Sequence, residues 1–212
     1  MSEGPVPGEP SGPVVAVCDA NLFYSVVMTD LLLSLGSAGL FVPRWTERIH
    51  EEWVGNLLSD KPDLDPEKVV RRRGQMDAAI EDSLIEGYEH LIPGLSLPDG
   101  DDRHVLAAAI QGGAGVILTY NLRDFPPAAL AGYGVAARHP DDFLSGLFGT
   151  RPAEVIDALE EMRSRKTRPA LSRAELLSKL SRQRLPTFVG VLRASGYAGE
   201  ETSPCGGEGT NG

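Results

Sequence analysis

The chain has 212 residues, of which 42% are hydrophobic and 24% charged, and this balance excludes a fibrous or wholly disordered protein. No segment reaches the roughly 18 consecutive apolar residues that a membrane span needs, so we expect no membrane association and a cytoplasmic location. The net charge of −10 excludes a uniformly basic surface for nucleic acid.

The two ends differ in composition from the rest of the chain. Residues 1–13 and 197–212 consist mainly of Gly, Pro, Ser, Thr and Glu, and such segments do not bury enough apolar surface to offset the entropy lost on ordering. We therefore expect a disordered leader and a disordered tail. Between them, the length is sufficient for one main domain and a smaller extension, which we place at residues 14–140 and 141–196.

The first half of the chain alternates between strand-like and helix-like patterns. Residues 14–18 form a short apolar, β-branched run that ends at Asp19, which predicts a buried parallel strand. Apolar residues at helical spacing predict one helix over about 22–35 and a second over about 44–58. Residues 63–88 are expected to form one or two more helices. Their inward side chains are predicted to be Val69, Met76, Ala79, Ile80 and Leu84.

The alternation continues in the next segment. After a loop, Asp101 or Asp102 is placed to cap a helix that ends at a pair of glycines. Residues 116–119 predict a second buried strand and residues 135–137 a third, before a helix over about 141–148. Strands that alternate with helices indicate an α/β fold in which helices cover both faces of a central parallel sheet.

Beyond Pro152 the pattern predicts helices alone, which form a small all-helical C-terminal extension. From Arg151 to Arg193 there are ten Lys and Arg residues against five Asp and Glu, a balance of +5, so the rest of the chain carries −15. The carboxyl-terminal region is therefore the basic part of the chain. We expect the basic extension to supply affinity for phosphate groups.

Acidic side chains follow the predicted strands. Ligands of an open parallel sheet collect at the carboxyl ends of its strands. Asp19 follows the first strand, a turn containing Asn121 and Asp124 follows the second, and Asp102 begins the helix that leads into it. Carboxylates that meet in one place repel each other unless a cation neutralises them. The pattern therefore predicts a site for Mg²⁺, or for Mn²⁺, which take oxygen ligands and retain waters.

Four segments, taken in order, resemble PIN-domain ribonucleases and in particular the VapC-like toxins of bacterial type II toxin-antitoxin pairs. They span about residues 14–140 and read VVAVCDAN, WTERIHEEW, LPDGDDRHVLAAA and GVILTYNLRDFP. The region from HPDDFLSGLF to Gly196 resembles the extension of one branch of these toxins. The resemblance implies a three-layer α/β/α fold, Mg²⁺-dependent hydrolysis of RNA, inhibition by a cognate antitoxin protein, and homodimerisation.

The resemblance also assigns roles to individual residues. Asp19, Glu52 and Asp102 match the first three acidic positions of the family. Asn121 stands where many relatives have an acidic residue, so the fourth position is open between Asn121 and Asp124. The implied metal ligands are Asp19, Asp102, Asn121 and Asp124. Glu52 is expected to orient the metal or its water, and Asn21 and Thr119 to hydrogen-bond the ligand carboxylates.

Simpler interpretations exist for the same residues. Asp102 is also a normal helix cap, and Glu52 a normal solvated helix residue that pairs with Arg48. The triplet Arg71, Arg72 and Arg73 is either a solvated helix face or a set of RNA contacts. Two other functions stay open at this point. One is a catalytically weak RNA-binding module whose site is incomplete at its fourth position. The other is a different metal-dependent phosphoesterase or nuclease that acts on DNA.

Overall fold

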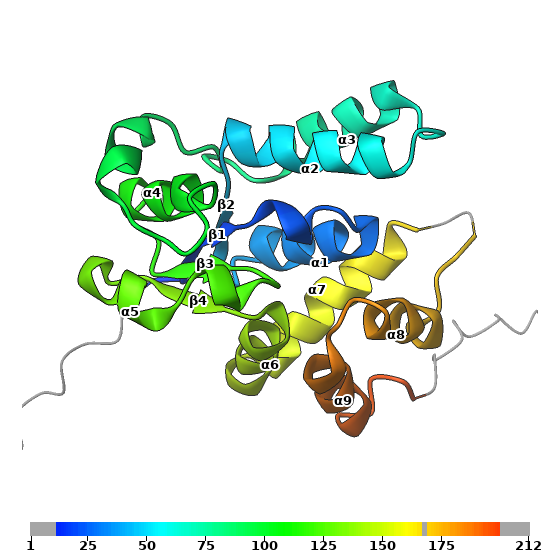
Figure 1. The fold of residues 1–212 in the computed structure, drawn as a ribbon. Coiled ribbons are helices and arrows are strands. Elements are labelled where there is room, and N and C mark those ends of the chain that lie inside the picture. Colours follow the sequence, from blue (N-terminus) through cyan, green and yellow to red (C-terminus); the bar gives the residue numbers. More distant parts are fainter. Residues whose placement is uncertain (1–11, 167–168, 200–212) are drawn as a thin grey trace, which may run out of the picture.

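The computed structural model describes residues 12–166 and 169–199 (Figure 1). The expected disordered leader, apart from residues 12 and 13, and the tail from residue 200 onward lie outside the described residues. Tyr197, which the composition assigns to the tail, is buried. Gly196 adopts φ +81°, a conformation that suits glycine, and turns the chain so that Tyr197 packs under the guanidinium of Arg173. The ordered extension therefore continues past residue 196.

A parallel sheet forms the centre of the fold, as predicted. In the described part of the chain it has four strands in the order β2-β1-β3-β4. The two central strands are β1 (Val15–Cys18) and β3 (Val116–Leu118), and the edge strands are β2 (Val42–Arg44) and β4 (Ala136–Arg138). Cys18 pairs with Leu118. Because both strands run in the same direction, the residues that follow them emerge side by side at one edge of the sheet.

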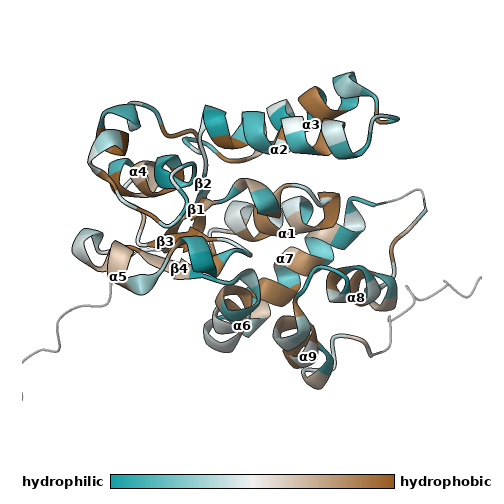
Figure 2. Ribbon diagram, viewed as in Figure 1, coloured by the Kyte–Doolittle hydropathy of each residue, from teal (hydrophilic) through white to brown (hydrophobic). Residues whose placement is uncertain are grey.

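Helices cover both faces of this sheet and complete an α/β/α arrangement. Those of the main domain are α1 (Val26–Ser37), α2 (Glu47–Asp60), α3 (Pro66–Ala79), α4 (Arg103–Gln111) and the short α5 (Pro127–Leu130). Four 3₁₀ turns lie in the connections: η1 (Ala20–Leu22), η2 (Glu89–Gly94), η3 (Leu122–Asp124) and η4 (Ala131–Tyr133). Figure 2 shows apolar residues on the strands and where helices face one another, whereas the outer side of α2 is polar.

Local capping explains where three of these helices begin. The side chains of Ser25, Thr46 and Asp65 accept hydrogen bonds from the first free backbone N–H groups of α1, α2 and α3. Pro66 occupies the first turn of α3, where a backbone N–H needs no partner within the helix. The fully buried Phe23, Trp45 and Trp53 lie in the core rather than on the surface.

The sequence interpretation missed strand β2. It placed the start of a helix near Arg44, but Val42, Pro43 and Arg44 pair with β1, and the helix begins at Glu47. A three-residue segment that contains proline carries a weak strand pattern, and proline is tolerated here because β2 is an edge strand. The pairing with β1 is a long-range contact that local periodicity does not report.

The expected helical region up to residue 88 was also partly wrong. Helix α3 ends at Ala79, and the chain then extends so that Trp45 N–H donates to the carbonyl of Ser83 and Ile85 N–H donates to that of Trp45. Side chains alternate in an extended segment, so Ile85 is buried and Leu84 is 39% exposed. Of the predicted inward stripe, Val69, Met76 and Ile80 are buried, whereas Ala79 and Leu84 are exposed.

The C-terminal extension is helical, as predicted, and packs directly on the main domain. It comprises α6 (Pro140–Thr150), α7 (Pro152–Ser164), α8 (Arg173–Ser181) and α9 (Pro186–Ala194). Helix α7 lies against α1 and α6 lies against α9. The buried carboxylate of Asp141 accepts hydrogen bonds from the backbone N–H groups of Thr187 (3.0 Å) and Phe188 (2.8 Å) at the start of α9. Among residues 12–166 and 169–199, no helix has the length and apolar character needed to cross a bilayer.

Candidate active site

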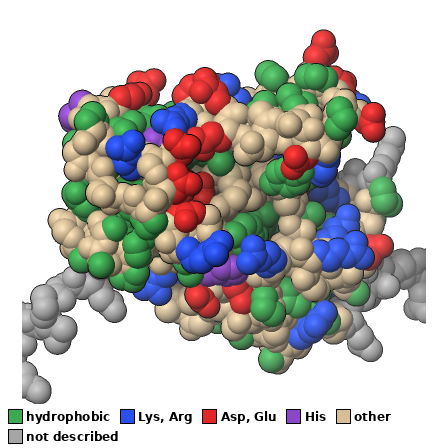
Figure 3. Space-filling model, in the orientation of Figure 1, with side chains coloured by type: hydrophobic (Ala, Val, Ile, Leu, Met, Phe, Trp, Pro, Cys, Tyr) green, Lys and Arg blue, Asp and Glu red, His purple; other side chains and the backbone are tan. Residues whose placement is uncertain are grey.

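A cavity of about 640 Å³ opens at the carboxyl ends of β1 and β3. Its acidic lining residues in the described chain are Asp19, Glu52, Asp60, Asp99, Asp102 and Asp124, and its other polar ones include Asn21, Asn56, Tyr120, Asn121 and Arg184. Figure 3 shows acidic side chains gathered in a strip near the middle of this face, with basic side chains bordering it. The structure thus brings together all four positions that the sequence analysis proposed: Asp19, Glu52, Asp102 and the turn at residues 121–124.

Asp19 is the most enclosed of these carboxylates, with 7% of its surface exposed. The pairing of Cys18 with Leu118 places Asp19 beside Thr119, and the backbone N–H of Asp19 donates to the Leu118 carbonyl at 3.0 Å. The Thr119 hydroxyl then donates to Asp19 Oδ2 at 2.7 Å, and Asn21 Nδ2 donates to the same oxygen at 2.6 Å. One carboxylate oxygen is therefore fixed by two side chains, and a backbone hydrogen bond from Ala20 also acts on this carboxyl.

Thr119 and Asn21 connect Asp19 to the turn that follows β3. Asn21 Nδ2 donates to Thr119 Oγ1 (2.9 Å), and that oxygen also accepts from the backbone N–H of Asn121 (2.9 Å). Asn21 Oδ1 accepts from the backbone N–H of Tyr120 at 3.2 Å. These two side chains occupy the supporting positions expected for them. They hold the end of β1 and the turn after β3 in one rigid frame.

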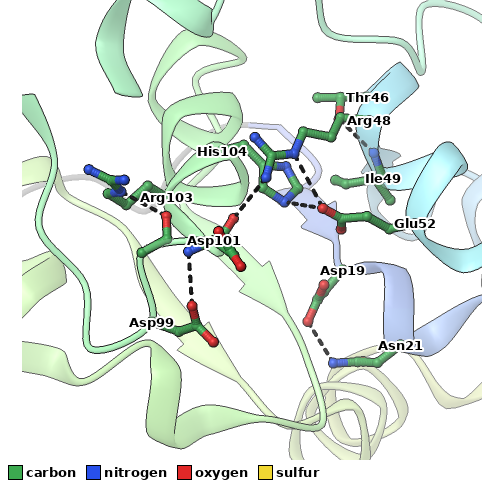
Figure 4. A network of polar contacts seen from close by, with 11 residues as sticks. Asp19, Asn21, Thr46, Arg48, Ile49, Glu52, Asp99, Asp101, Arg103 and His104 are labelled. Atoms are coloured by element: carbon green, nitrogen blue, oxygen red, sulfur yellow. Dashed lines mark hydrogen bonds and ion pairs between the residues drawn. The ribbon is translucent and has the colours of Figure 1, made fainter. Parts of the chain in front are cut away.

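Glu52 reaches the cavity from α2. It is partly buried and lines the cavity, whereas its neighbour Glu51 is exposed. Its Oε1 atom contacts His104 Nε2 at 2.9 Å and Arg48 Nε at 3.3 Å. Figure 4 shows Asp19 and Glu52 pointing toward the same space, with Asp99 across from them on the loop before α4. Glu52 therefore forms the expected ion pair with Arg48 and also lines the cavity.

Asp102 and the turn after β3 supply the remaining oxygen atoms. Asp102 is the N-cap residue of α4, but its side chain makes no capping hydrogen bond, so its carboxylate is left to the cavity. In the turn, Asn121 Nδ2 donates to Asp124 Oδ2. Asn121 therefore orients Asp124, and both residues line the cavity. The arrangement favours Asp124 as the acidic group at the fourth position, with Asn121 beside it.

The carboxylates of the cavity perturb one another. Burial raises the pKa of Asp19 above its usual range, and the hydrogen bond from Thr119 opposes this. The pKa of Asp102 is raised to about 7, chiefly by burial and then by the charges of Asp19 and Asp124, with smaller contributions from Asp99 and Glu52. Clustered carboxylates resist full ionisation because their charges repel one another. A bound divalent cation would neutralise these charges and stabilise the ionised carboxylates.

The cluster is open rather than tight. Within the described residues, no three His, Cys, Asp or Glu side chains converge closely enough to enclose a metal ion on their own. Mg²⁺ usually keeps several waters and takes one or two protein carboxylates. The oxygen-only donor set of Asp19, Asp102 and Asp124, in a roomy cavity, fits a hydrated Mg²⁺ or Mn²⁺ better than a dehydrated, fully protein-bound ion.

The arginine triplet does not line this cavity. Arg72 is partly buried, stacks on Trp53 with 4.8 Å to the ring centroid, and donates to the Phe23 carbonyl and the Thr29 hydroxyl. Arg73 pairs with Glu47. These two arginines connect α3 to α1 and α2, and therefore have a structural role. Arg71 is exposed, and for this residue the RNA contact stays a prediction.

Several residues of the site were not identified from the sequence. Asp60 lines the cavity and accepts a hydrogen bond from Tyr24 Oη at 3.1 Å. His104 is buried, and its Nε2 atom contacts Glu52. Asp60 lies two turns after Glu52 on α2, a helical spacing that signals a shared face. Arg184 comes from the extension, and no local sequence pattern places it beside residues of the main domain.

A comparison with protein families matches the C-terminal extension. Residues 140–194 match the family model described as the VapC50 C-terminal domain. A stretch of 58 residues is 52% identical to a Mycobacterium tuberculosis protein named "Putative ribonuclease VapC50", and it covers 27% of this chain and 34% of that protein. No solved structure matches the chain. Residues 140–194 are thus similar to the VapC50 C-terminal domain, and they pack on a parallel α/β/α fold that has an acidic cavity at its strand ends.

Proposed function

We propose that this protein is a Mg²⁺-dependent endoribonuclease and the toxin of a type II toxin-antitoxin pair. The observation that carries the proposal is the group of carboxylates at the ends of β1 and β3, where burial and then the neighbouring charges raise the pKa of Asp102 to about 7. The name of the Mycobacterium tuberculosis relative, a ribonuclease, supports the choice of reaction. RNA, a cognate antitoxin that covers the cavity, a second copy of the chain and a cytoplasmic location belong to the same proposal.

The residues of the cavity divide into holding and orienting groups. A bound Mg²⁺ or Mn²⁺ would lower the pKa of a water and neutralise charge on the phosphodiester oxygens. Asp19 and Asp102 would hold the ion, together with Asp124 and the amide oxygen of Asn121. Glu52, which contacts His104 and Arg48, would accept a hydrogen bond from the attacking water.

The supporting residues act by fixing geometry. Thr119 and Asn21 hold one oxygen of Asp19 and so fix the orientation of this carboxylate at the cavity. Asn121 performs the same task for Asp124. No covalent nucleophile takes part in this scheme, and the side chains serve to position water and phosphate.

A second function is favoured by the open cluster and by Asn121 at the fourth position. An incomplete site gives a protein that binds RNA and cleaves it weakly or not at all. A DNA nuclease is the remaining alternative. All three are separated by one experiment on RNA and DNA substrates.

The test measures cleavage of labelled single-stranded RNA, single-stranded DNA and duplex DNA by the purified full chain. We expect cleavage of RNA with MgCl₂ or MnCl₂, none in excess EDTA, and a loss of at least about 100-fold in Asp19→Asn and Asp102→Asn because each change removes a ligand carboxylate. Glu51→Gln is the matched control, since it removes the same charge from the exposed neighbour of Glu52. Circular dichroism verifies that each variant is folded.

The alternative outcomes are distinct. RNA cleavage that persists in EDTA or in both aspartate variants contradicts the assigned site. Binding of RNA without metal-dependent cleavage supports the second function, and preferential cleavage of DNA supports the third.

A further inference from the structure

One cation lies among the acidic residues that line the cavity in the described chain. Arg184 belongs to the turn between α8 and α9, and it lines the cavity together with Asp19, Glu52, Asp102 and other carboxylates of the main domain. The extension therefore contributes a side chain to the candidate active site. A basic residue in this position attracts a polyanion that the carboxylates of the cavity repel.

Two contacts attach this turn to the residue that follows Thr119. The hydroxyl of Tyr120 donates to the backbone carbonyl of Gln183 at 2.9 Å. The guanidinium of Arg184 lies over the Tyr120 ring, with 5.2 Å between its central carbon and the ring centroid. Tyr120 N–H in turn donates to Asn21, which holds Asp19. The position of Arg184 is thus linked through Tyr120 to the frame that fixes the catalytic carboxylates.

The backbone at Arg184 is unfavourable for a residue with a side chain. Its φ is +58°, and Asp82 is the other non-glycine residue with positive φ in the described parts of the chain. Glycine adopts this left-handed conformation without steric cost, so it is the usual residue in such a turn. A bulky side chain in this conformation at a cavity is typical of a functional position.

The guanidinium is available to a ligand. Arg184 is exposed, and within residues 12–166 and 169–199 it forms no ion pair with the surrounding carboxylates. A cation–π contact does not use the N–H groups of a guanidinium as hydrogen-bond donors to an acceptor atom, so they stay available to a ligand. These N–H groups match the two unesterified oxygens of a phosphodiester, which accept bidentate hydrogen bonds.

We propose that Arg184 of the C-terminal extension binds a backbone phosphate of the RNA strand that occupies the acidic cavity. This assignment rests on the proposed function, because it takes RNA as the substrate. It gives the extension a defined role at the site, distinct from general electrostatic attraction. A cation is needed there because the cavity carboxylates repel phosphate wherever a metal ion does not neutralise them.

The test compares three variants of the full chain, each also made with Asp19→Asn so that binding is measured without cleavage. Arg184→Gly removes the side chain and relieves the backbone, Arg184→Lys retains the charge without the planar fork, and Arg182→Ala removes the same charge from an exposed residue of the same turn that does not line the cavity. Binding to a fluorescein-labelled single-stranded RNA is followed by fluorescence anisotropy between about 50 and 200 mM KCl.

We expect Arg184→Gly to weaken RNA binding about 10- to 100-fold, the range of a charge-assisted bidentate contact. The slope of log Kd against log salt concentration should fall by about 0.7, the value for one phosphate contact on a single strand. Arg184→Lys should lie between Arg184→Gly and the unmodified protein, and Arg182→Ala within about threefold of the latter. The melting temperature of Arg184→Gly should equal or exceed that of the parent, because glycine removes the unfavourable conformation.

Unchanged binding and salt slope in Arg184→Gly would overturn the proposal, and so would an equal loss in Arg182→Ala, which indicates a diffuse charge effect. The proposed function is tested separately by measuring RNA cleavage in the proteins that retain Asp19. If the protein binds RNA without cleaving it, the proposed function fails while the comparison of Arg184→Gly with Arg182→Ala still decides the role of Arg184. If the protein binds no RNA, both fail.

Discussion

The pKa of Asp102 reflects the burial of this residue among other carboxylates. Its pKa is about 7 in the folded chain against 3.8 for an ordinary Asp, chiefly because it is buried and also because other carboxylates surround it. The folded state therefore binds this proton more tightly than the unfolded state does. Stability contributed by Asp102 is lost as the pH rises from about 4 to about 7, and the loss is complete above that range.

Replacing Asp102 by Asn should consequently stabilise the metal-free protein at pH 8 and change it little at pH 4. Asp102 is partly exposed, so solvent screening reduces the effect. We expect a rise in melting temperature of about 2–4 °C at pH 8, which corresponds to about 1 kcal/mol in a chain of this size. Differential scanning fluorimetry in EDTA measures it. Asp101→Asn is the control, because Asp101 is exposed and outside the cavity; an equal gain in both variants would contradict the assignment.

The site residues that could be predicted from the sequence are those that directly follow a strand. Asp19 and Thr119 directly follow two apolar strands, and parallel strands bring such residues together. The choice of Glu52 over Glu51 came from a family resemblance, and the structure places Glu52 in the cavity. Arg184 depends instead on how α8 and α9 pack against Tyr120, and this tertiary contact has no signature in the local sequence.

At the scale of elements, the register of β1 against β3 sets the geometry of the site. It places the fully buried Thr119 hydroxyl where it donates to Asp19 and accepts from Asn21 and from the Asn121 backbone. Thr119→Val keeps the shape of the side chain but removes one of the two side-chain hydrogen bonds to Asp19 Oδ2 and the acceptor of the Asn121 backbone N–H. We expect a loss of about 1–3 kcal/mol in unfolding free energy, measured by urea titration, and a greater loss of nuclease activity.

Thr119→Ser is the matched control for this change, because it retains the hydroxyl and loses a methyl group. It should preserve activity within about tenfold and unfold with a smaller loss of stability than Thr119→Val. If Val and Ser at this position give equal activity, the hydroxyl does not position Asp19. The readout of activity separates a role at the site from a purely structural one.

Helices were easier to predict than the shortest strands. The caps Ser25, Thr46 and Asp65 and the first-turn Pro66 are local signals, and the helices begin beside them. Strand β2 has three residues, one of them Pro43, and its partner in β1 lies 27 residues earlier in the register that pairs Val15 with Val42. The extended segment around Ile85 is likewise held by backbone contacts with Trp45 rather than by its own sequence.

At the scale of the whole molecule, the extension and the main domain share one core. Buried residues of α7 pack on α1, and buried residues from β1 to α9 form one continuous hydrophobic cluster. Deleting the extension would expose that core and unfold the site with it. Point changes at the junction are therefore the appropriate probes of how the two regions cooperate.

Asp141 provides such a probe. Its buried carboxylate accepts hydrogen bonds from two backbone N–H groups at the start of α9, where a negative charge is also favoured by the helix dipole. Asp141→Asn removes the charge and replaces one acceptor oxygen by a donor, so we expect a loss of about 1–3 kcal/mol. Both tryptophans, Trp45 and Trp53, lie in the main domain, so their fluorescence reports unfolding of that region.

If the chain is one cooperative unit, urea unfolding followed by tryptophan fluorescence and by far-ultraviolet circular dichroism should give coincident curves. Asp141→Asn should then shift both midpoints downward by the same amount, although Asp141 contacts neither tryptophan. A circular dichroism midpoint that falls while the fluorescence midpoint stays fixed would show that the extension unfolds independently. In that case, the position of Arg184 at the cavity would depend on a docking equilibrium, and RNA binding would weaken in Asp141→Asn even where the main domain stays folded.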